Sequence, residues 1–324
     1  MHRDSPLISG EFKRIELFLH AFREAGGATS GPLVPLGPGD DAAIIAPRGP
    51  LAVTTDALVE DVHFRRAWAT WEQIGHKALA VNLSDLAAMG ARPLAFTCAF
   101  ALPPDIEDDS LIGLAGGMGR LASHHGAVLA GGNFSRAREV SITITAFGEV
   151  TGEGLRRHRA RPGDVVILVG EVGVAAAELQ RLESGGSLPD GSSALLTPHP
   201  QIAAALAAVP ESVCGIDVSD GLIQDLGHVA AASNVAMRIR YELIPQTERF
   251  RGLTASATSE ERAQLLLAGG EDYALVLIAS PANGARLCRA LAAVIIGDVV
   301  EGTGVTVSGA PGGTVLRGHD HFAG

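Results

Sequence analysis

Gly39-Asp40-Asp41-Ala42-Ala43-Ile44-Ile45 is the stretch around which the rest of this chain is organised. Two adjacent carboxylates follow a loop rich in Gly and Pro and precede a short apolar run. Adjacent carboxylates repel each other unless a cation lies between them or water screens them. An isolated acidic pair of this kind is most often a polar turn before a strand, so the pair alone does not identify a site.

Carboxylates beside Gly, Ser or Thr recur in four later stretches of the chain. These stretches are Thr54-Thr55-Asp56, Asn82-Leu83-Ser84-Asp85, Asp217-Val218-Ser219-Asp220-Gly221 and Gly269-Gly270-Glu271-Asp272. Magnesium takes oxygen ligands and is usually bound by carboxylates together with substrate phosphates. The sequence therefore predicts that these stretches gather into one metal-rich phosphate site.

The composition is that of a globular protein with an acidic balance. The 324 residues favour two domains rather than one. A formal net charge of -11 argues against a nucleic-acid partner, because such proteins usually carry a basic patch. Lys13 and Lys77 are the two lysines. An anionic substrate would therefore be held through divalent metal, arginine or backbone N–H groups.

The cysteines and the N-terminus exclude several classes of protein. Cys98, Cys214 and Cys288 are odd in number and lack a C-x-x-C spacing, so we expect free, buried thiols rather than disulfides or a zinc site. The first twelve residues have no apolar region typical of a signal peptide. No apolar run is long enough to span a bilayer. We expect a soluble, cytoplasmic protein with no membrane partner.

Hydrophobic periodicity predicts an α/β (α+β) chain. Helices are expected at residues 11–24, 70–90, 108–125, 201–208, 260–268 and 281–293. Two more are expected between the strand that ends at residue 170 and about residue 182, and directly after residue 221. Strands are expected at residues 42–46, 51–55, 94–102, 127–130, 140–150, 164–170, 213–218, up to 279, and 294–299. The composition shifts at the Gly- and Arg-rich residues 151–162. We place the domain boundary there, giving domains 1–152 and 153–324.

Several candidate residues fall at the expected ends of these elements, and most of them have a structural as well as a functional interpretation. Asp56 would project from the end of a strand. Asp85 lies late in a helix, where the macrodipole disfavours a carboxylate unless a cation is bound, although a solvent-facing acid fits equally well. Gly131-Gly132 after a strand would let backbone approach a phosphate, yet such a pair is usually a turn. Ser219 and Asp220 open a helix as N-caps or as phosphate contacts.

The common nucleotide motifs are absent from the chain. There is no G-x-x-x-x-G-K-[ST] loop, no G-x-G-x-x-G after a strand, no G-x-S-x-G elbow and no protein-kinase signature. Phosphoryl transfer depends mainly on alignment and charge neutralisation. Aspartates supplied by separate segments are therefore consistent with metal ions that hold a triphosphate.

Six motifs together resemble the thiamine-monophosphate kinase family of the AIR-synthetase-like (PurM-like) superfamily. They are GDDAAI at 39–44, TTDALVEDVHF at 54–64, HKALAVNLSDLAAMGARP at 76–93, GIDVSDGLIQDLGH at 215–228, GGEDY at 269–273 and GHDHF at 318–322. The resemblance implies a two-domain PurM-like fold. An N-terminal sheet domain that binds ATP and Mg²⁺ would pair in a homodimer, and a C-terminal α/β domain would complete the active site.

The resemblance also implies an activity and a set of site residues. The activity is transfer of the ATP γ-phosphoryl group to thiamine monophosphate, assisted by several Mg²⁺ ions, without an evident general base. Metal ligands would be Asp40, Asp41, Thr54, Thr55, Asp56, Asp85, Asn133, Asp217 and Asp220. ATP contacts would be His125, Gly132, Asn133, Arg136 and Ser219. Substrate contacts would be His63, Glu271 and His319.

The chain departs from the family pattern at two positions. The family has Gly-Gly-Asp followed by small hydroxyl residues, whereas this chain has Gly132-Asn133-Phe134-Ser135. Asn offers a carbonyl oxygen to Mg²⁺ but no charge. His319 replaces a larger aromatic residue. The alternatives are therefore another PurM-like ATP-dependent enzyme, or a homologue that binds ATP but turns over weakly.

Overall fold

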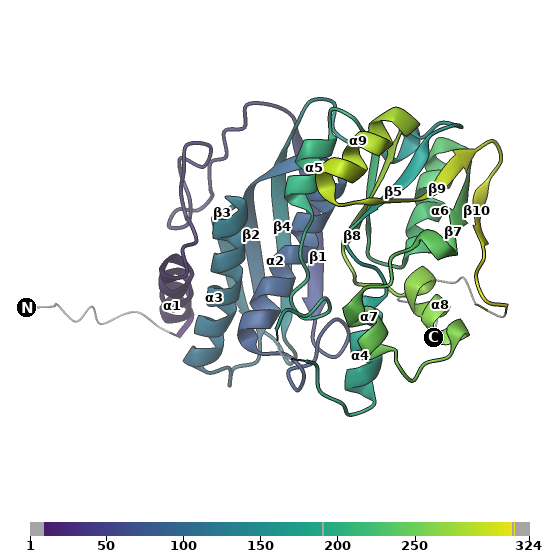
Figure 1. Ribbon diagram of the computed structural model, residues 1–324. Helices are drawn as coiled ribbons and strands as arrows, with labels where there is room; N and C mark the ends of the chain where they lie inside the picture. The colour runs from purple at the N-terminus through teal and green to yellow at the C-terminus, as the bar shows by residue number, and fades with distance from the viewer. Residues whose placement is uncertain (1–9, 190, 313, 315–324) are drawn as a thin grey trace, which may run out of the picture. The chain divides into compact units, whose positions relative to one another are not determined.

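The computed structural model in Figure 1 describes residues 10–189, 191–312 and 314. The chain divides into two compact units. The first contains residues up to Leu83 together with Pro93–Glu149. The second contains Ser84–Arg92 together with the chain from Val150 onward.

The first unit is a four-stranded sheet with three helices. Its strands are β1 (Leu51–Val59), β2 (Ala91–Leu102), β3 (Val128–Arg136) and β4 (Ser141–Val150), in the order β1-β4-β2-β3. Strands β1 and β4 are antiparallel, and β2 and β3 are parallel. The helices are α1 (Gly10–Glu24), α2 (Trp71–Ala88) and α3 (Asp108–His125).

Helices α2 and α3 lie across one face of this sheet (Figure 1). Alternate residues of β4 are buried, among them Ile142, Ile144 and Ala146, as expected for a strand with one covered face. The two helices approach closely because Gly117 faces the carbonyl of Glu72, where a Cβ atom would not fit. Helix α1 packs on α3.

The second unit has a six-stranded sheet in the order β10-β7-β9-β5-β8-β6. Its strands are β5 (Val165–Val169), β6 (Cys214–Val218), β7 (Ala236–Arg240), β8 (Ala274–Ala279), β9 (Val294–Val300) and β10 (Gly304–Ser308). Its helices are α4 (Val174–Glu183), α5 (Ile202–Ala208), α6 (Leu222–Ser233), α7 (Glu248–Leu253), α8 (Ser259–Ala268) and α9 (Pro281–Leu291). Two 3₁₀ turns occur at Arg157–Arg159 and Tyr241–Leu243.

Two neighbouring strands of this sheet, one of them at its edge, are buried along their whole length. Every residue of β6 and of β8 is buried, and β8 accordingly reads as a continuous apolar run in the sequence. Their side chains join those of α4, α6 and α8 in one hydrophobic core.

Most expected elements are present, and the mixed helix and sheet class is confirmed. A capping box opens α2. The backbone N–H of Gln73 donates to Thr70 Oγ1 at 3.2 Å, and the backbone N–H of Thr70 donates to Gln73 Oε1 at 2.9 Å. Strands β7 and β10 and helix α7 were not predicted.

Three local predictions are wrong. Residues 42–46 form no strand, because Ile44 makes only an isolated bridge to Leu36. Asp56 does not end its strand, since β1 continues to Val59. The Gly131-Gly132 pair is not a turn after a strand but lies within β3, which continues to Arg136.

Two further predictions concern the burial of the cysteines and the absence of a membrane-spanning segment. Cys98 and Cys214 are buried, whereas Cys288 is only half-buried, so complete burial is wrong for that residue. Among the described residues, no helix combines the length and the apolar character needed to cross a membrane.

Candidate functional site

A pocket of about 800 Å³ lies in the first unit between α1, the loop 37–43 and strands β2 and β3. Four predicted site residues line it: Asp40, Asp41, Gly132 and Asn133. The rest of the lining includes apolar side chains at Phe12, Ile15, Phe18, Leu19, Phe100 and Phe134. The pocket therefore joins an acidic, glycine-rich part to an aromatic part.

Gly132 is required by packing as well as by the proposed phosphate contact. It pairs with Cys98 in the parallel β2–β3 ladder. A Cβ atom at this position would overlap the backbone carbonyl of Cys98, whereas a Cβ atom at Gly131 would meet nothing within 4 Å. A side chain at Gly132 would therefore force β2 and β3 apart.

Phe134 has a structural role where the family pattern has a small hydroxyl residue. Its ring stacks on Phe100 with centroids 4.8 Å apart and meets Phe18 edge-on at 6.0 Å. Phe18 belongs to α1, so this departure from the family pattern adds aromatic contacts between α1 and the sheet. Such pairs contribute about 0.5–1.5 kcal/mol each beyond the area they bury.

The acidic pair of the quoted motif lies at the surface of the pocket. Asp40 and Asp41 are both exposed. The backbone N–H of Asp41 donates to Asp40 Oδ1 at 2.8 Å. That contact fixes one carboxylate oxygen of Asp40 within a bend, and the two side chains remain solvated.

The three β1 residues predicted as metal ligands do not all point the same way. Side chains alternate along a strand, so Thr54 and Asp56 share the covered face of the sheet and Thr55 lies on the other. The Thr55 hydroxyl donates to the carbonyl of Ile144 at 3.0 Å and accepts from the Thr145 hydroxyl at 3.1 Å. The backbone N–H of Asp56 donates to the buried Asn82 Oδ1 at 3.1 Å.

His63 lies in a turn that is fixed from several sides. Its Nδ1 accepts the backbone N–H of Val59 at 3.1 Å. The ring therefore carries its proton on Nε2, which can donate to an anionic ligand. Lys77, 2% exposed, donates to the His63 carbonyl at 3.0 Å. Glu60 adds an ion pair with Arg66 and accepts the backbone N–H of Val140 at 3.2 Å.

Three predicted ATP contacts, Arg136, His125 and Ser219, do not line the pocket. Arg136 lies three residues beyond Asn133 on β3, about 10 Å along the strand, and is not among the lining residues. His125 is in the last turn of α3, where its ring packs against His124. His319 lies outside the described residues.

In the second unit, a buried aspartate lies among other acids. Asp217 on β6 is 4% exposed and accepts the Ser84 hydroxyl at 2.7 Å. Burial raises the pKa of Asp217 to about 7, and the nearby charge of Asp85 adds to the rise. A cation beside Asp217 and Asp85 would remove both costs.

The loop 218–221, which links β6 to α6, is tied to one carboxylate. Asp225 Oδ2 accepts the backbone N–H groups of Ser219, Asp220 and Gly221, at 3.1, 3.1 and 3.2 Å. The expectation that Ser219 or Asp220 caps α6 is wrong, because the N-cap residue is Gly221, without a side-chain bond. Burial raises the pKa of Asp225 to about 7.

The GGEDY loop carries a second tied carboxylate. Asp272, 8% exposed, accepts the backbone N–H of Gly173 at 2.6 Å and of Ala175 at 3.0 Å. Its neighbour Glu271, the predicted substrate contact, is half-buried. Burial raises the pKa of Asp272 to about 7.

Sequence reasoning did not single out Asp225 or Asp272 as distinct from the acids around them. A signal was present for Asp225, since an acid four residues after Gly221 falls in the first turn of the next helix. One ligand atom from each of Asp220, Asp225 and His228 lies within 4.8 Å of the others. Part of the predicted set lies together in each unit, namely Asp40, Asp41, Gly132 and Asn133 in the first and the acids around Asp217 and Asp220 in the second, and the union of all predicted residues in one site stays a prediction.

Comparison with known proteins assigns the chain to a family. The N-terminal domain of AIR synthase related proteins matches residues 39–150, and the C-terminal domain matches residues 161–309. The thiamine-monophosphate kinase of Mycobacterium tuberculosis is 35% identical over 279 residues, covering 84% of this chain and 82% of that one. The chain belongs to the thiamine-monophosphate kinase family.

Solved structures of thiamine-monophosphate kinases share the fold of both units. The enzyme of Stenotrophomonas maltophilia K279a superimposes with a TM-score of 0.81 at 35% identity, covering 91% of this chain and 97% of that one. AaThiL complexed with AMPPCP and TMP gives a TM-score of 0.75 at 28% identity, covering 96% of this chain and 97% of that one. The two-domain PurM-like fold expected from the sequence is confirmed.

Proposed function

We propose that this protein transfers the γ-phosphoryl group of ATP to thiamine monophosphate, giving thiamine diphosphate and ADP. The observation that carries the proposal is membership of the thiamine-monophosphate kinase family across both units. A relative of the same fold binds AMPPCP, an ATP analogue, together with TMP. The two ligands correspond to the donor and the acceptor of such a reaction.

The pocket of the first unit suits one end of a nucleotide. Its aromatic part offers faces on which a base can stack, and its glycine-rich part lets backbone approach phosphates. Gly132 and Asn133 would contact the phosphates there. The predicted contacts of Arg136, His125 and Ser219 with ATP lack this support, because none of the three lines the pocket.

The acids of the site fit hard divalent cations. Asp217 is buried beside the charge of Asp85, an arrangement that a cation stabilises. Mg²⁺ would be held by Asp40, Asp41, Thr54, Asp56, Asp85, Asn133, Asp217 and Asp220, and the number of ions follows from which of these bind. The predicted contact of Thr55 lacks this support, because its hydroxyl lies on the other face of the sheet and bonds Ile144 and Thr145. When bound, the metal neutralises phosphate charge and fixes the phosphate geometry.

The acceptor substrate would be oriented by hydrogen bonds from His63 to its phosphate and by Glu271. His63 would donate from Nε2, since its Nδ1 is already an acceptor. Glu271 would accept from the amino or ring groups of the thiamine part. An acceptor phosphate needs no deprotonation near neutral pH, so transfer would proceed directly and in line, without a general base.

The protein would act as a homodimer in the cytoplasm. Strand β1 lies at the edge of its sheet, and Val53 is 59% exposed on the face opposite the helices. Ile44 is a second exposed apolar residue in the same unit, at 54%. An exposed apolar face of this kind is typical of an interface with another chain.

A comparison of turnover by the purified wild type and by Asn133→Asp tests the proposed function. The assay measures ADP and thiamine diphosphate formed from ATP, Mg²⁺ and thiamine monophosphate. We expect the wild type to turn over, and Asn133→Asp to bind Mg²⁺ about tenfold more tightly because it restores a charged ligand.

Two other results have distinct meanings. Turnover by Asn133→Asp alone would indicate a homologue that binds ATP and has lost a metal charge. Binding of ATP and Mg²⁺ without turnover by either protein would contradict the acceptor assignment. In that case, other PurM-like ATP-dependent reactions become the alternative.

A further inference from the structure

We infer that Asp272 is a positioning residue: it ties the GGEDY loop to the start of α4 and so sets the direction in which Glu271 meets the acceptor substrate. This inference rests on the proposed function for the role of Glu271. It rests on the structure of the second unit for the tie itself. It also assigns different roles to two neighbouring acids of one motif: Glu271 contacts the substrate, and Asp272 holds the loop in place.

The tie is a helix cap supplied from elsewhere in the chain. Gly173 is the N-cap residue of α4 and supplies no side-chain bond to the first turn. The two carboxylate oxygens of Asp272 take its place, one accepting from Gly173 at 2.6 Å and the other from Ala175 at 3.0 Å. Unpaired N–H groups of a first helical turn need such partners when they are buried.

The backbone on both sides of Asp272 is strained. Glu271 has φ 66° and Tyr273 has φ 50°, the left-handed region that residues other than Gly rarely adopt. Two such residues in three persist only where surrounding contacts impose them. The bonds of Asp272 lie between these two residues and supply that constraint.

The strained loop also joins the loop 218–221. The backbone N–H of Glu271 donates to the Ser219 carbonyl at 2.8 Å, and that of Tyr273 donates to the Val218 carbonyl at 2.9 Å. A Cβ atom at Gly270 would lie 2.5 Å from the Ser219 carbonyl oxygen, so the loops touch directly. Release of Asp272 would therefore free Glu271 and loosen its two bonds to this loop.

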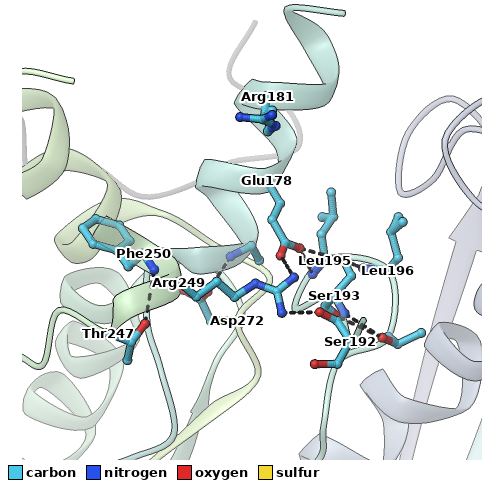
Figure 2. A network of polar contacts seen from close by, with 12 residues as sticks. Glu178, Arg181, Ser192, Ser193, Leu195, Leu196, Thr247, Arg249, Phe250 and Asp272 are labelled. Carbon is cyan, nitrogen blue, oxygen red and sulfur yellow. Dashed lines mark hydrogen bonds and ion pairs between the residues drawn. The ribbon is translucent and has the colours of Figure 1, made fainter. Parts of the chain in front are cut away.

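Helix α4 carries a control carboxylate near its middle. Glu178 is fully buried and pairs with Arg249, as Figure 2 shows. It also accepts the Ser193 hydroxyl at 2.6 Å and the Leu195 backbone N–H at 3.0 Å. Glu178 is thus a second buried, tied carboxylate on the same helix, but its hydrogen-bond partners belong to other segments.

Asp272→Asn and Glu178→Gln test the inference by two readouts. The first is hydrogen exchange at the backbone amides of Glu271 and Tyr273 in the full chain. The second is steady-state kinetics with thiamine monophosphate and ATP varied separately. Both variants should unfold at lower temperature than the wild type, because each loses part of a buried network.

We expect Asp272→Asn alone to change the loop and the acceptor. Exchange at Glu271 and Tyr273 should speed up at least tenfold, and the KM for thiamine monophosphate should rise about tenfold or more, since small misplacements of a contact are costly. The KM for ATP should change less than about twofold. Glu178→Gln should leave both KM values and both amides near wild type.

Three results would overturn the inference or its basis. Faster exchange with an unchanged KM for thiamine monophosphate would make Asp272 merely structural. An equal rise of KM in Glu178→Gln would assign the effect to general loss of stability. If Asp272→Asn speeds up exchange but the wild type does not phosphorylate thiamine monophosphate, the proposed function is contradicted, whereas the hydrogen bonds of Asp272 to α4 are confirmed as a structural constraint.

Ala175→Pro is a second test of the role of Asp272, for use if Asp272→Asn does not fold. It removes one of the two donors to Asp272 and leaves every carboxylate in place. Proline is tolerated in the first turn of a helix, where its missing N–H is not part of the helical ladder. We expect a smaller rise in the KM for thiamine monophosphate, again without a change for ATP. An unchanged KM in a folded Ala175→Pro protein with faster exchange would contradict the inference.

Discussion

Gly132 shows how one residue can meet two demands at the residue scale. The parallel pairing of β2 and β3 places it against the Cys98 carbonyl, where only a hydrogen atom fits. The same missing side chain exposes backbone to the pocket. A glycine in this motif therefore cannot be read as a phosphate contact from its identity alone.

Gly132→Ala should lower the free energy of unfolding by about 1–3 kcal/mol, the usual cost of an overpacked site. Gly131→Ala is the matched control in the same strand, because a Cβ atom there meets nothing within 4 Å. It should be neutral, or stabilising by up to about 1 kcal/mol, since glycine weakens a strand. Urea unfolding of both variants measures the difference. Equal effects of the two substitutions would refute the packing role.

At the scale of elements, long periodic patterns predicted helices accurately, whereas short apolar runs predicted strands poorly. Helix α3 has the predicted bounds, because its pattern is long and its end is marked by Gly126 in a left-handed conformation. Residues 42–46 resemble a strand in composition, but Ala43 and Ile45 instead pack as a loop against the small cluster around Val34. A short apolar run cannot distinguish these outcomes.

The roles of the acids were predictable only in part. The sequence identified the acidic stretches, and the structure brings the Asp40–Asp41 and Gly132–Asn133 pairs to one pocket. Nothing in the sequence separated Asp272 from the proposed ligands, and the one signal for Asp225 was its place in the first turn of α6. The difference lies in which backbone N–H groups face each carboxylate, and tertiary contacts decide that.

The loops that carry these acids should make metal-free protein less stable at higher pH. Burial raises the pKa of Asp272 from 3.8 to about 7. A raised pKa means that the folded state holds the proton more tightly than the unfolded state. The resulting stabilisation is complete below the unfolded pKa and is lost as pH rises through 7.

Urea unfolding with EDTA at pH 5.5 and pH 8.0 measures this effect. For Asp272, the loss between these pH values is about 2 kcal/mol, from 1.36 kcal/mol per pKa unit. Asp272→Asn cannot titrate, so its stability should fall by about 2 kcal/mol less than that of the wild type. Equal falls in the two proteins would mean that the N–H groups of Gly173 and Ala175 outweigh burial and keep the carboxylate charged.

At the scale of the whole molecule, the first unit has a sheet with unequal faces. Helices α2 and α3 cover one face (Figure 1). Part of the other face is covered by the loop that contains Ala43 and Ile45, which packs with Phe147. Val53 and Thr55 alternate onto this second face near the edge of the sheet, and Val53 is 59% exposed. Exposed apolar surface does not stabilise a monomer, whereas a second copy of the chain would bury it.

The wild type should therefore sediment as a dimer, and Val53→Asp should shift it toward monomer. A charge placed inside an apolar interface loses hydration without gaining a partner. A stable interface buries about 800 Å² on each partner, so one central charge should weaken dimerisation by tenfold or more. Ile112→Asp is the control, because Ile112 is an apolar residue of the same unit, 42% exposed on α3. Analytical ultracentrifugation over a range of concentrations gives the dissociation constants. A monomeric wild type would refute the dimer, and dissociation caused equally by Ile112→Asp would place the interface on the helical face instead.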